Sequence, residues 1–197
     1  MTGRHALDPA LVLRAYREGI FPMAVEDGDI AWFSPDPRGI IPLDTFHVPA
    51  RLARVVRSGR FEVHVDRAFE RVMRACADRR DREGTWISDE IIECYVALHR
   101  LNLAHSVETW QGGSLVGGLY GVHLGGAFFG ESMFHHVTDA SKVALAALVD
   151  RLQRRNFRLL DVQWLTPHLE QFGAVEISRT EYLSRLKDAI AKDCGFL

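Results

Sequence analysis

AHSVETWQGGSLVGGLYGVHLGGAFFGESMF (residues 104–134) is the stretch from which the fold can be predicted. From His105 to Trp110, and again from Ser114 to His123, side chains alternate in the two-residue period of a β-strand. The Gln111-Gly112-Gly113 sequence between them is typical of a tight turn, so we predict an antiparallel pair. Ala127–Phe134 is predicted as a third strand.

Part of this stretch could be mistaken for a membrane segment. Residues 109–130 form a stretch without Asp, Glu, Lys or Arg that is nominally long enough to cross a bilayer. However, 8 of the 16 glycines lie there, which favours a β-ribbon. The first 19 residues also lack the apolar core and cleavage site of a signal peptide. We therefore expect a cytoplasmic protein with no membrane partner.

The flanking segments predict a mixed α+β fold. Asp8 and Pro9 open a first helix that ends at Gly19, and residues 20–47 are predicted to be ordered loop with a short strand. A second helix is predicted over residues 49–58, and a charged loop over 78–85. From residue 61 the predicted order is β-α-α-β-β-β-α-β-α-β-α, which is a mixed sheet flanked by helices. We predict a small N-terminal domain over residues 1–60 and a larger domain over 61–197.

Charge is distributed unevenly along the chain. The net charge of −2 excludes a histone-like polycation. Residues 51–82, however, hold ten Arg and five acids, which gives this stretch +5 and leaves −7 for the remainder. Arg51, Arg54, Arg57 and Arg60 recur on one broad helical face. Because 21 of the 24 bases are Arg, base composition of the genome is one explanation, and binding of nucleic-acid phosphates is the other.

Common catalytic and cofactor motifs are absent: the sequence has no GxGxxG, Walker A, HExxH or GxSxG. Three widely spaced cysteines without a CxxC argue against a disulfide framework or a zinc site. His135 and His136 are adjacent, so they point apart on a strand, and no metal is expected.

Three polar residues are candidates for chemistry. Asp161 and Gln163 alternate with apolar residues in LLDVQW, which places both on one side of a predicted interior strand. They form either a structural pair bonded to loop backbone or part of a site. Glu131 lies among aromatic residues in FFGESMF, where burial disfavours its charged form unless a cation meets it. Trp32, Phe33, Trp86 and Trp110 could stack on bases, although for each residue alone core packing is the better explanation.

Nine stretches together resemble the leucyl/phenylalanyl-tRNA–protein transferase family. They follow one order over about 160 residues, which makes the resemblance specific. The stretches are YREGIFPM (16–23), WFSPDPRG (32–39), TWIS (85–88), AHSVETW (104–110), LVGGLYGV (115–122), FFGESMF (128–134), ASKVAL (140–145), LLDVQ (159–163) and a T-x-H-L…GA pattern (166–174).

The resemblance implies an enzyme that moves leucine or phenylalanine, and methionine less readily, from aminoacyl-tRNA to proteins that begin with Arg or Lys. This marks those proteins for degradation by the bacterial N-degron pathway. It also implies a small N-terminal domain followed by a domain like the GNAT acyltransferases. Because the aminoacyl ester is already activated, no metal, ATP or other cofactor is expected. We expect a monomer.

The resemblance also implies roles for individual residues. Asp161 would orient and polarise Gln163, which would contact the attacking amine, and Glu131 would lie in the site of the cationic acceptor. The transferred side chain would occupy an apolar pocket formed by Leu119, Phe128, Met133, Leu148 and Leu160. The tRNA 3′ end would contact Tyr16, Met23, Trp32 and Trp86, although Met23 stands where some members have tryptophan. The acceptor stem would contact Arg51, Arg54, Arg57 and Arg60.

Two other functions share some of these features. An acetyl-CoA-dependent N-acyltransferase on the same fold would need an Arg/Gln-x-x-Gly-x-Gly/Ala loop to hold pyrophosphate, and the sequence has none. A non-catalytic tRNA-binding module would need the basic face but not Asp161, Gln163 and Glu131.

Overall fold

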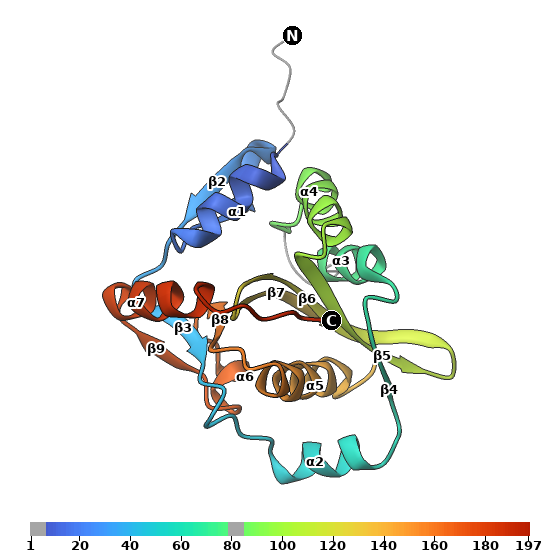
Figure 1. Ribbon diagram of the computed structural model, residues 1–197. Helices are drawn as coiled ribbons and strands as arrows, with labels where there is room; N and C mark the ends of the chain where they lie inside the picture. The colour runs from blue at the N-terminus through green and yellow to red at the C-terminus, as the bar shows by residue number, and fades with distance from the viewer. Residues whose placement is uncertain (1–6, 79–84) are drawn as a thin grey trace.

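The computed structural model describes residues 7–78 and 85–197, and the fold is built on two sheets of unequal size (Figure 1). The small sheet is a hairpin of β1 (Phe21–Ala24) and β2 (Ile30–Phe33), joined by the short 3-10 helix η1 (Glu26–Gly28). The large sheet has seven strands in the order β4-β5-β6-β7-β8-β3-β9. All its neighbours are antiparallel except the parallel pair β7 and β8.

The strands of the large sheet come from distant parts of the chain. Their bounds are β3 (Arg38–Ile41), β4 (Glu62–Val65), β5 (Ala104–Gln111), β6 (Ser114–Leu124), β7 (Ala127–His135), β8 (Leu159–Gln163) and β9 (Val175–Ile177). The predicted antiparallel pair is confirmed as β5 and β6, with Gly112 and Gly113 both at positive φ in the turn. Residues 20–47 hold three strands, whereas the sequence predicted one.

Seven helices are found in the described residues. They are α1 (Pro9–Arg17), α2 (Ala50–Arg57), α3 (Phe69–Ala77), α4 (Asp89–Arg100), α5 (Ala140–Arg154), α6 (Pro167–Glu170) and α7 (Arg179–Ile190). The side chains of Asp8, Ser88, Thr166 and Ser178 accept a backbone N–H in the first turn of α1, α4, α6 and α7. The predicted element order from residue 61 is confirmed, apart from residues 79–84 of the charged loop, which lie outside the described residues.

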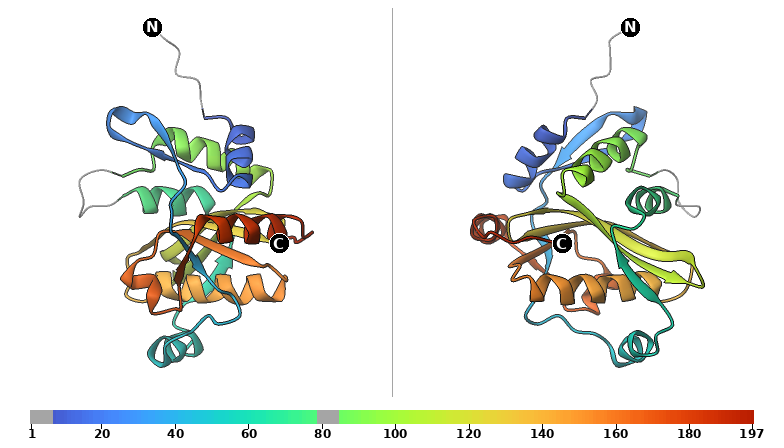
Figure 2. Two further views of the ribbon diagram at one scale, coloured as in Figure 1. Left: turned by 90° about the vertical axis from the view of Figure 1, so that its left-hand side faces the viewer. Right: turned by 45° about the vertical axis from the view of Figure 1, so that its right-hand side comes forward.

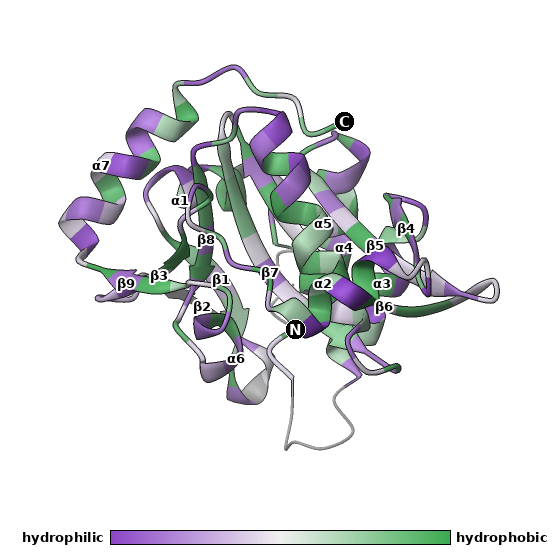
Figure 3. Cartoon of the chain, turned by 90° about the horizontal axis from the view of Figure 1, so that it is seen from below, coloured by the Kyte–Doolittle hydropathy of each residue, from purple (hydrophilic) through white to green (hydrophobic). Residues whose placement is uncertain are grey.

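Helices cover both faces of the large sheet, as the two views in Figure 2 show. Helix α5 packs on one face, with α2 beyond it, and α3, α4 and α1 cover the other. Two apolar cores result, one on each side of the sheet. In Figure 3 the polar and apolar residues of α7 alternate, as expected of a helix that buries one side, here Tyr182, Leu186 and Ala189.

The mixed α+β architecture with helices on both faces is confirmed. The division at residue 60 stays a prediction, and one strand bears on it: β3 precedes residue 60 but pairs with β8 and β9 in the large sheet. The side chains of Cys76 and Cys94 are both buried. Among the described residues, no helix combines the length and the apolar character needed to cross a bilayer.

Candidate active site

A cavity of about 290 Å³ lies where the parallel strands β7 and β8 separate. Their pairing ends at Phe129 and Asp161, although both strands continue beyond this point. The cavity is lined by residues of β1, β6, β7, α5, β8 and α6. It therefore connects the α5 side of the sheet with the side on which β1 lies.

Two β-bulges flank this separation. In β7, Glu131 is the extra residue, because Tyr120 pairs with Ser132 and Gly121 with Gly130. In β8, the extra residue is Val162, between Asp161 and Gln163. Bulges re-aim side chains, and here both Glu131 and Gln163 line the cavity.

Glu131 lies at the centre of a buried hydrogen-bond chain. The Tyr16 hydroxyl donates to Glu131 Oε1 at 2.6 Å, and the Gln163 amide donates to the same oxygen at 3.3 Å. The Tyr16 and Tyr95 hydroxyls are 2.5 Å apart. Burial is the main cause that raises the pKa of Glu131 to about 8; the bond from Tyr16 acts in the opposite direction. A buried carboxyl with a raised pKa is a candidate for proton transfer.

Asp161 lies beside the cavity but does not line it. Its carboxylate accepts two hydrogen bonds from Arg38, at 2.9 Å to Oδ1 and 2.6 Å to Oδ2, and both side chains are at most 1% exposed. The Tyr182 hydroxyl donates to Oδ2 at 2.7 Å. Toward Gln163, Asp161 contacts the backbone: Oδ1 accepts the Gln163 N–H at 2.9 Å.

Gln163 has a strained backbone. Its φ is +60°, and the Trp164 N–H donates to the Val162 carbonyl across it at 2.7 Å. This is a γ-turn of the rare positive-φ form. Such conformations cost about 1–3 kcal/mol and persist where the surroundings hold them. Asp161 contacts Arg38 and Tyr182, and Gln163 contacts Glu131, whereas Leu160 and Val162 pack in the core on the α5 side. The alternation therefore agrees with the sequence prediction, and the turn at Gln163 is the feature that was not predicted.

Comparisons with known proteins identify the family. The family model described as leucyl/phenylalanyl-tRNA protein transferase matches residues 40–187, and the model of its N-terminal domain matches residues 5–36. The chain belongs to the leucyl/phenylalanyl-tRNA–protein transferase family. The chain is 57% identical to the Leucyl/phenylalanyl-tRNA--protein transferase of Paramagnetospirillum magneticum, over 94% of this chain and 90% of that one. It is 56% identical to that of Gloeobacter violaceus, over 96% and 97%.

Two solved structures of other proteins are distantly similar to this transferase-family chain. L-PGS from Bacillus licheniformis has a TM-score of 0.43 and 14% identity, covering 77% of this chain and 51% of that chain. A GCN5-related N-acetyltransferase-like protein from Streptococcus suis has a TM-score of 0.39 and 17% identity, covering 86% and 64%.

The apolar residues predicted for a leucyl/phenylalanyl pocket can now be placed. Leu119, Met133, Leu148 and Leu160 line the cavity from its α5 side. Phe128 does not line it: the ring is fully buried and stacks on Phe196 at 5.2 Å between centroids. Phe128 is therefore a support behind the cavity. Leu145 also lines the cavity on this side and was missed, because its place depends on how α5 docks.

Only two of the four residues predicted to contact the tRNA 3′ end line the cavity. Met23 and Trp86 line the cavity, and the Ala24 N–H donates to the Trp86 carbonyl, which fixes Trp86 beside β1. Trp32 is 38% exposed on β2, outside the cavity lining. Tyr16 is fully buried behind Glu131, so a direct stacking contact with a base is inconsistent with its position. Trp164, which also lines the cavity and is 43% exposed, was not predicted there.

The predicted acceptor-stem arginines lie apart from the cavity. Arg51, Arg54 and Arg57 are on α2, and Arg60 is exposed just after it. All three arginines on α2 are exposed to solvent. Helix α2 lies at the end of the molecule opposite α1 and β2 (Figure 1). The exposed face of α2 is therefore separate from the residues that line the cavity.

One further cluster has the composition of a metal site. Ligand atoms of Asp66, His99 and His105 lie within 4.8 Å of one another. His99 Nδ1 lies 2.8 Å from the Ala104 carbonyl and His105 Nδ1 lies 2.7 Å from Asp66 Oδ2. Because both partners only accept, each Nδ1 carries its hydrogen and is not available to a metal, which leaves only the Nε2 atoms. We propose no metal for this cluster.

A pocket-shortening substitution tests the leucyl/phenylalanyl pocket. Leu148→Phe adds volume at the α5 side of the cavity, and we expect transfer of phenylalanine to fall at least about tenfold relative to transfer of leucine. Leu148→Met, which conserves volume, is the matched control and should leave the ratio unchanged. The measurement is the initial rate with each charged tRNA. Equal losses for the two amino acids would contradict the placement.

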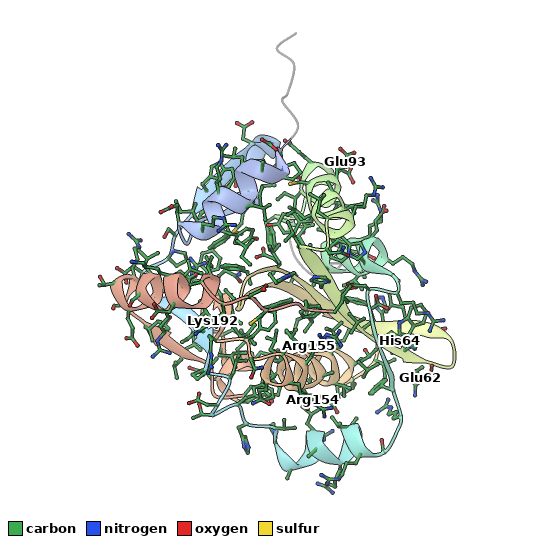
Figure 4. All side chains as sticks on the ribbon, viewed as in Figure 1. Glu62, His64, Glu93, Arg154, Arg155 and Lys192 are labelled. Atoms are coloured by element: carbon green, nitrogen blue, oxygen red, sulfur yellow. The ribbon has the colours of Figure 1, made fainter. Side chains whose placement is uncertain are left out.

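Glu131 should also lower stability as pH rises. The pKa of Glu131 is about 8 in the folded chain and 4.5 when the side chain is exposed. Between pH 4.5 and pH 8, the folded state therefore keeps a proton that the unfolded state has lost. The free energy of unfolding therefore falls across this window. Glu131→Gln cannot ionise, so its stability relative to wild type should rise from pH 5 to pH 8 in urea unfolding. The exposed Glu93, labelled on α4 in Figure 4, provides the control Glu93→Gln. An equal rise for both variants would contradict the assignment.

Proposed function

We propose that this chain transfers leucine or phenylalanine, and methionine less readily, from aminoacyl-tRNA to the N-terminal Arg or Lys of acceptor proteins, which marks them for N-degron degradation. The observation that carries the proposal is the contact of Glu131 with Gln163 where β7 and β8 separate. An apolar wall on the α5 side adjoins this polar pair in the same cavity. The names of the relatives support the same reaction.

The proposed donor site divides the cavity by chemistry. The transferred side chain occupies the wall formed by Leu119, Met133, Leu145, Leu148 and Leu160. The terminal adenosine lies toward Met23 and Trp86 on the β1 side. The ester carbonyl is then held between these regions, next to Glu131 and Gln163. No cofactor is required, because the ester already carries the activation.

The proposed step exchanges an ester for an amide. The acceptor amine nitrogen forms a bond to the ester carbonyl carbon, and the bond from that carbon to the ribose oxygen breaks. The Gln163 amide oxygen orients the amine, and Glu131 accepts its proton and passes it to the departing ribose oxygen. Burial raises the pKa of Glu131 to about 8, which suits a carboxyl that takes up a proton and then releases it.

Glu131 also suits a cationic acceptor. A positive side chain at the acceptor N-terminus stabilises the carboxylate that burial otherwise disfavours. Asp161 stays a candidate member of the site through its bond to the Gln163 backbone. We place the protein in the cytoplasm, where charged tRNA is found, as a monomer without a membrane partner.

The test is a transfer assay with Leu-, Phe- and Met-tRNA against peptides that begin with Arg, Lys or Ala. Labelled amino acid should appear on the Arg and Lys peptides and not on the Ala peptide. Binding of tRNA without transfer would favour a tRNA-binding module. Acylation that depends on acetyl-CoA would favour the other acyltransferase class.

The arginines of α2 give a separate prediction about tRNA. Replacing Arg51, Arg54 and Arg57 with alanine should weaken tRNA binding and reduce the slope of log Kd against log salt by about 2 to 3, because each phosphate that an arginine neutralises adds slightly less than one to this slope. The matched control replaces Arg185, Lys187 and Lys192, which are exposed on or after α7. Figure 4 shows Lys192 separated from α2. An unchanged slope would mean that these arginines do not contact tRNA phosphates and are explained by the base composition of the genome.

A further inference from the structure

We propose that Arg38 and Tyr182 are positioning residues for the transfer reaction, because they clamp Asp161 in the orientation that holds the strained Gln163 turn. The inference rests on the proposed function, since it concerns the placement of Gln163 at the reacting ester. It changes the role of Asp161: the carboxylate acts on the Gln163 backbone instead of polarising its side-chain amide.

The first step is the fixed orientation of Asp161. Arg38 meets it with two parallel hydrogen bonds from Nε and a terminal nitrogen, and Tyr182 adds a third. This fork geometry restrains the plane of the carboxylate as well as its position. With both oxygens engaged and the side chain fully buried, Asp161 has one orientation available.

The second step is the fixed orientation of Arg38 itself. Its remaining terminal nitrogen donates to the Gly19 carbonyl at 2.9 Å. The guanidinium carbon lies 4.4 Å from the centroid of the Tyr182 ring and 4.9 Å from that of Phe21. These contacts come from α7 and from the segment around β1, so together with Asp161 in β8 three distant parts of the chain converge on one cation.

The third step links the clamp to Gln163. Asp161 Oδ1 accepts the Gln163 N–H, and this bond spans the bulge in which Gln163 has a φ of +60°. On the opposite strand, Gly39 pairs with Gln163, and a Cβ at Gly39 would lie 2.7 Å from the Trp164 carbonyl carbon. The turn is thus confined from both sides, and its side chain is directed to Glu131.

The fourth step is the reason a clamp is needed. A positive φ at a residue with a Cβ is unfavourable unless surrounding contacts hold it. Without the clamp the β8 backbone relaxes toward an extended strand, and the Gln163 side chain turns away from Glu131. The loss is then one of orientation in the transition state, and kcat falls while substrate binding changes little.

The experiment uses Arg38→Lys, which keeps the charge but not the fork, and Tyr182→Phe, which removes one hydrogen bond. Each should lower kcat at least about fivefold, with KM for Leu-tRNA and for the Arg peptide within about twofold. In a Gln163→Ala background neither change should lower kcat further, because the residue through which they act is gone. The control is Ser106→Ala, which removes a buried hydrogen bond to Glu108 in β5 and should leave kcat unchanged in both backgrounds.

Several results would overturn the proposal. A wild-type kcat in both clamp variants would do so. A further loss of kcat when either change is added to Gln163→Ala would also do so, because independent losses indicate a general structural effect. Full activity of Gln163→Ala would remove the residue the clamp serves. Backbone hydrogen exchange separates this inference from the proposed function: the Gln163 N–H should exchange at least about tenfold faster in Arg38→Lys, whether or not the wild type transfers leucine. An unchanged exchange rate would contradict the clamp.

Discussion

Glu131→Gln is expected to reduce transfer of labelled leucine to an Arg-starting peptide by at least about 100-fold. Glutamine preserves the shape and can still accept from Tyr16, so the network around Tyr95 should remain. It cannot accept a proton, however, and it presents no negative charge to a cationic acceptor. The expected loss therefore combines slower chemistry with weaker acceptor binding.

The two contributions can be separated by measuring KM for each substrate. The KM for the Arg peptide should rise at least about tenfold, whereas the KM for Leu-tRNA should stay within about threefold. Glu108→Gln is the matched control, because Glu108 is also a buried glutamate but bonds to Ser106 and Trp110 in the sheet. It should affect stability without affecting either KM. Equal weakening of peptide and tRNA in Glu131→Gln would contradict the acceptor-side role.

Asp161→Ala is expected to destabilise the fold by about 3–5 kcal/mol, because it leaves the Arg38 guanidinium buried without its acid. Arg38 is 1% exposed and also packs between Phe21 and Tyr182, so water cannot replace the lost carboxylate. Against a typical stability of about 5–15 kcal/mol, this is a large fraction. Urea unfolding at constant pH provides the measurement.

A double variant is the appropriate control. Arg38→Met combined with Asp161→Leu removes both charges and should recover most of the lost stability, since apolar pairs often replace buried ion pairs without loss. A destabilisation of less than about 1 kcal/mol in Asp161→Ala would contradict the role of this buried ion pair. The expectation also means that inactivity of Asp161→Ala is not by itself evidence that Asp161 takes part in chemistry.

Local signals explain why most elements were predictable. Asp8, Ser88 and Ser178 cap their helices by hydrogen bonds within three residues, and the Gly112-Gly113 turn needs only its own backbone freedom. The apolar pocket residues Leu119, Met133, Leu148 and Leu160 were reached through the family resemblance, and they line one cavity.

The site departs from prediction where two strands depart from regular geometry. The alternation in LLDVQW predicted the shared side of Asp161 and Gln163, but not the γ-turn at Gln163 or the bond from its backbone N–H to Asp161. Tyr16 was predicted at the tRNA 3′ end, yet the docking of α1 buries it against Glu131, which is 115 residues away. Nothing within a strand or helix encodes such a displacement, because it depends on which element packs alongside.

The amino-acid sequence by itself determined the order of helices and strands from residue 61, the turn chemistry and the family, because these depend on patterns within short segments. Only the tertiary structure decided which polar side chains share the cavity. Arg38 reaches Asp161 across 123 residues, and Gln163 reaches Glu131 across 32. The physical reason is that burial makes each unpaired charge or amide costly. The partners of such groups come from distant elements that pack together, so residue spacing within one element does not predict them.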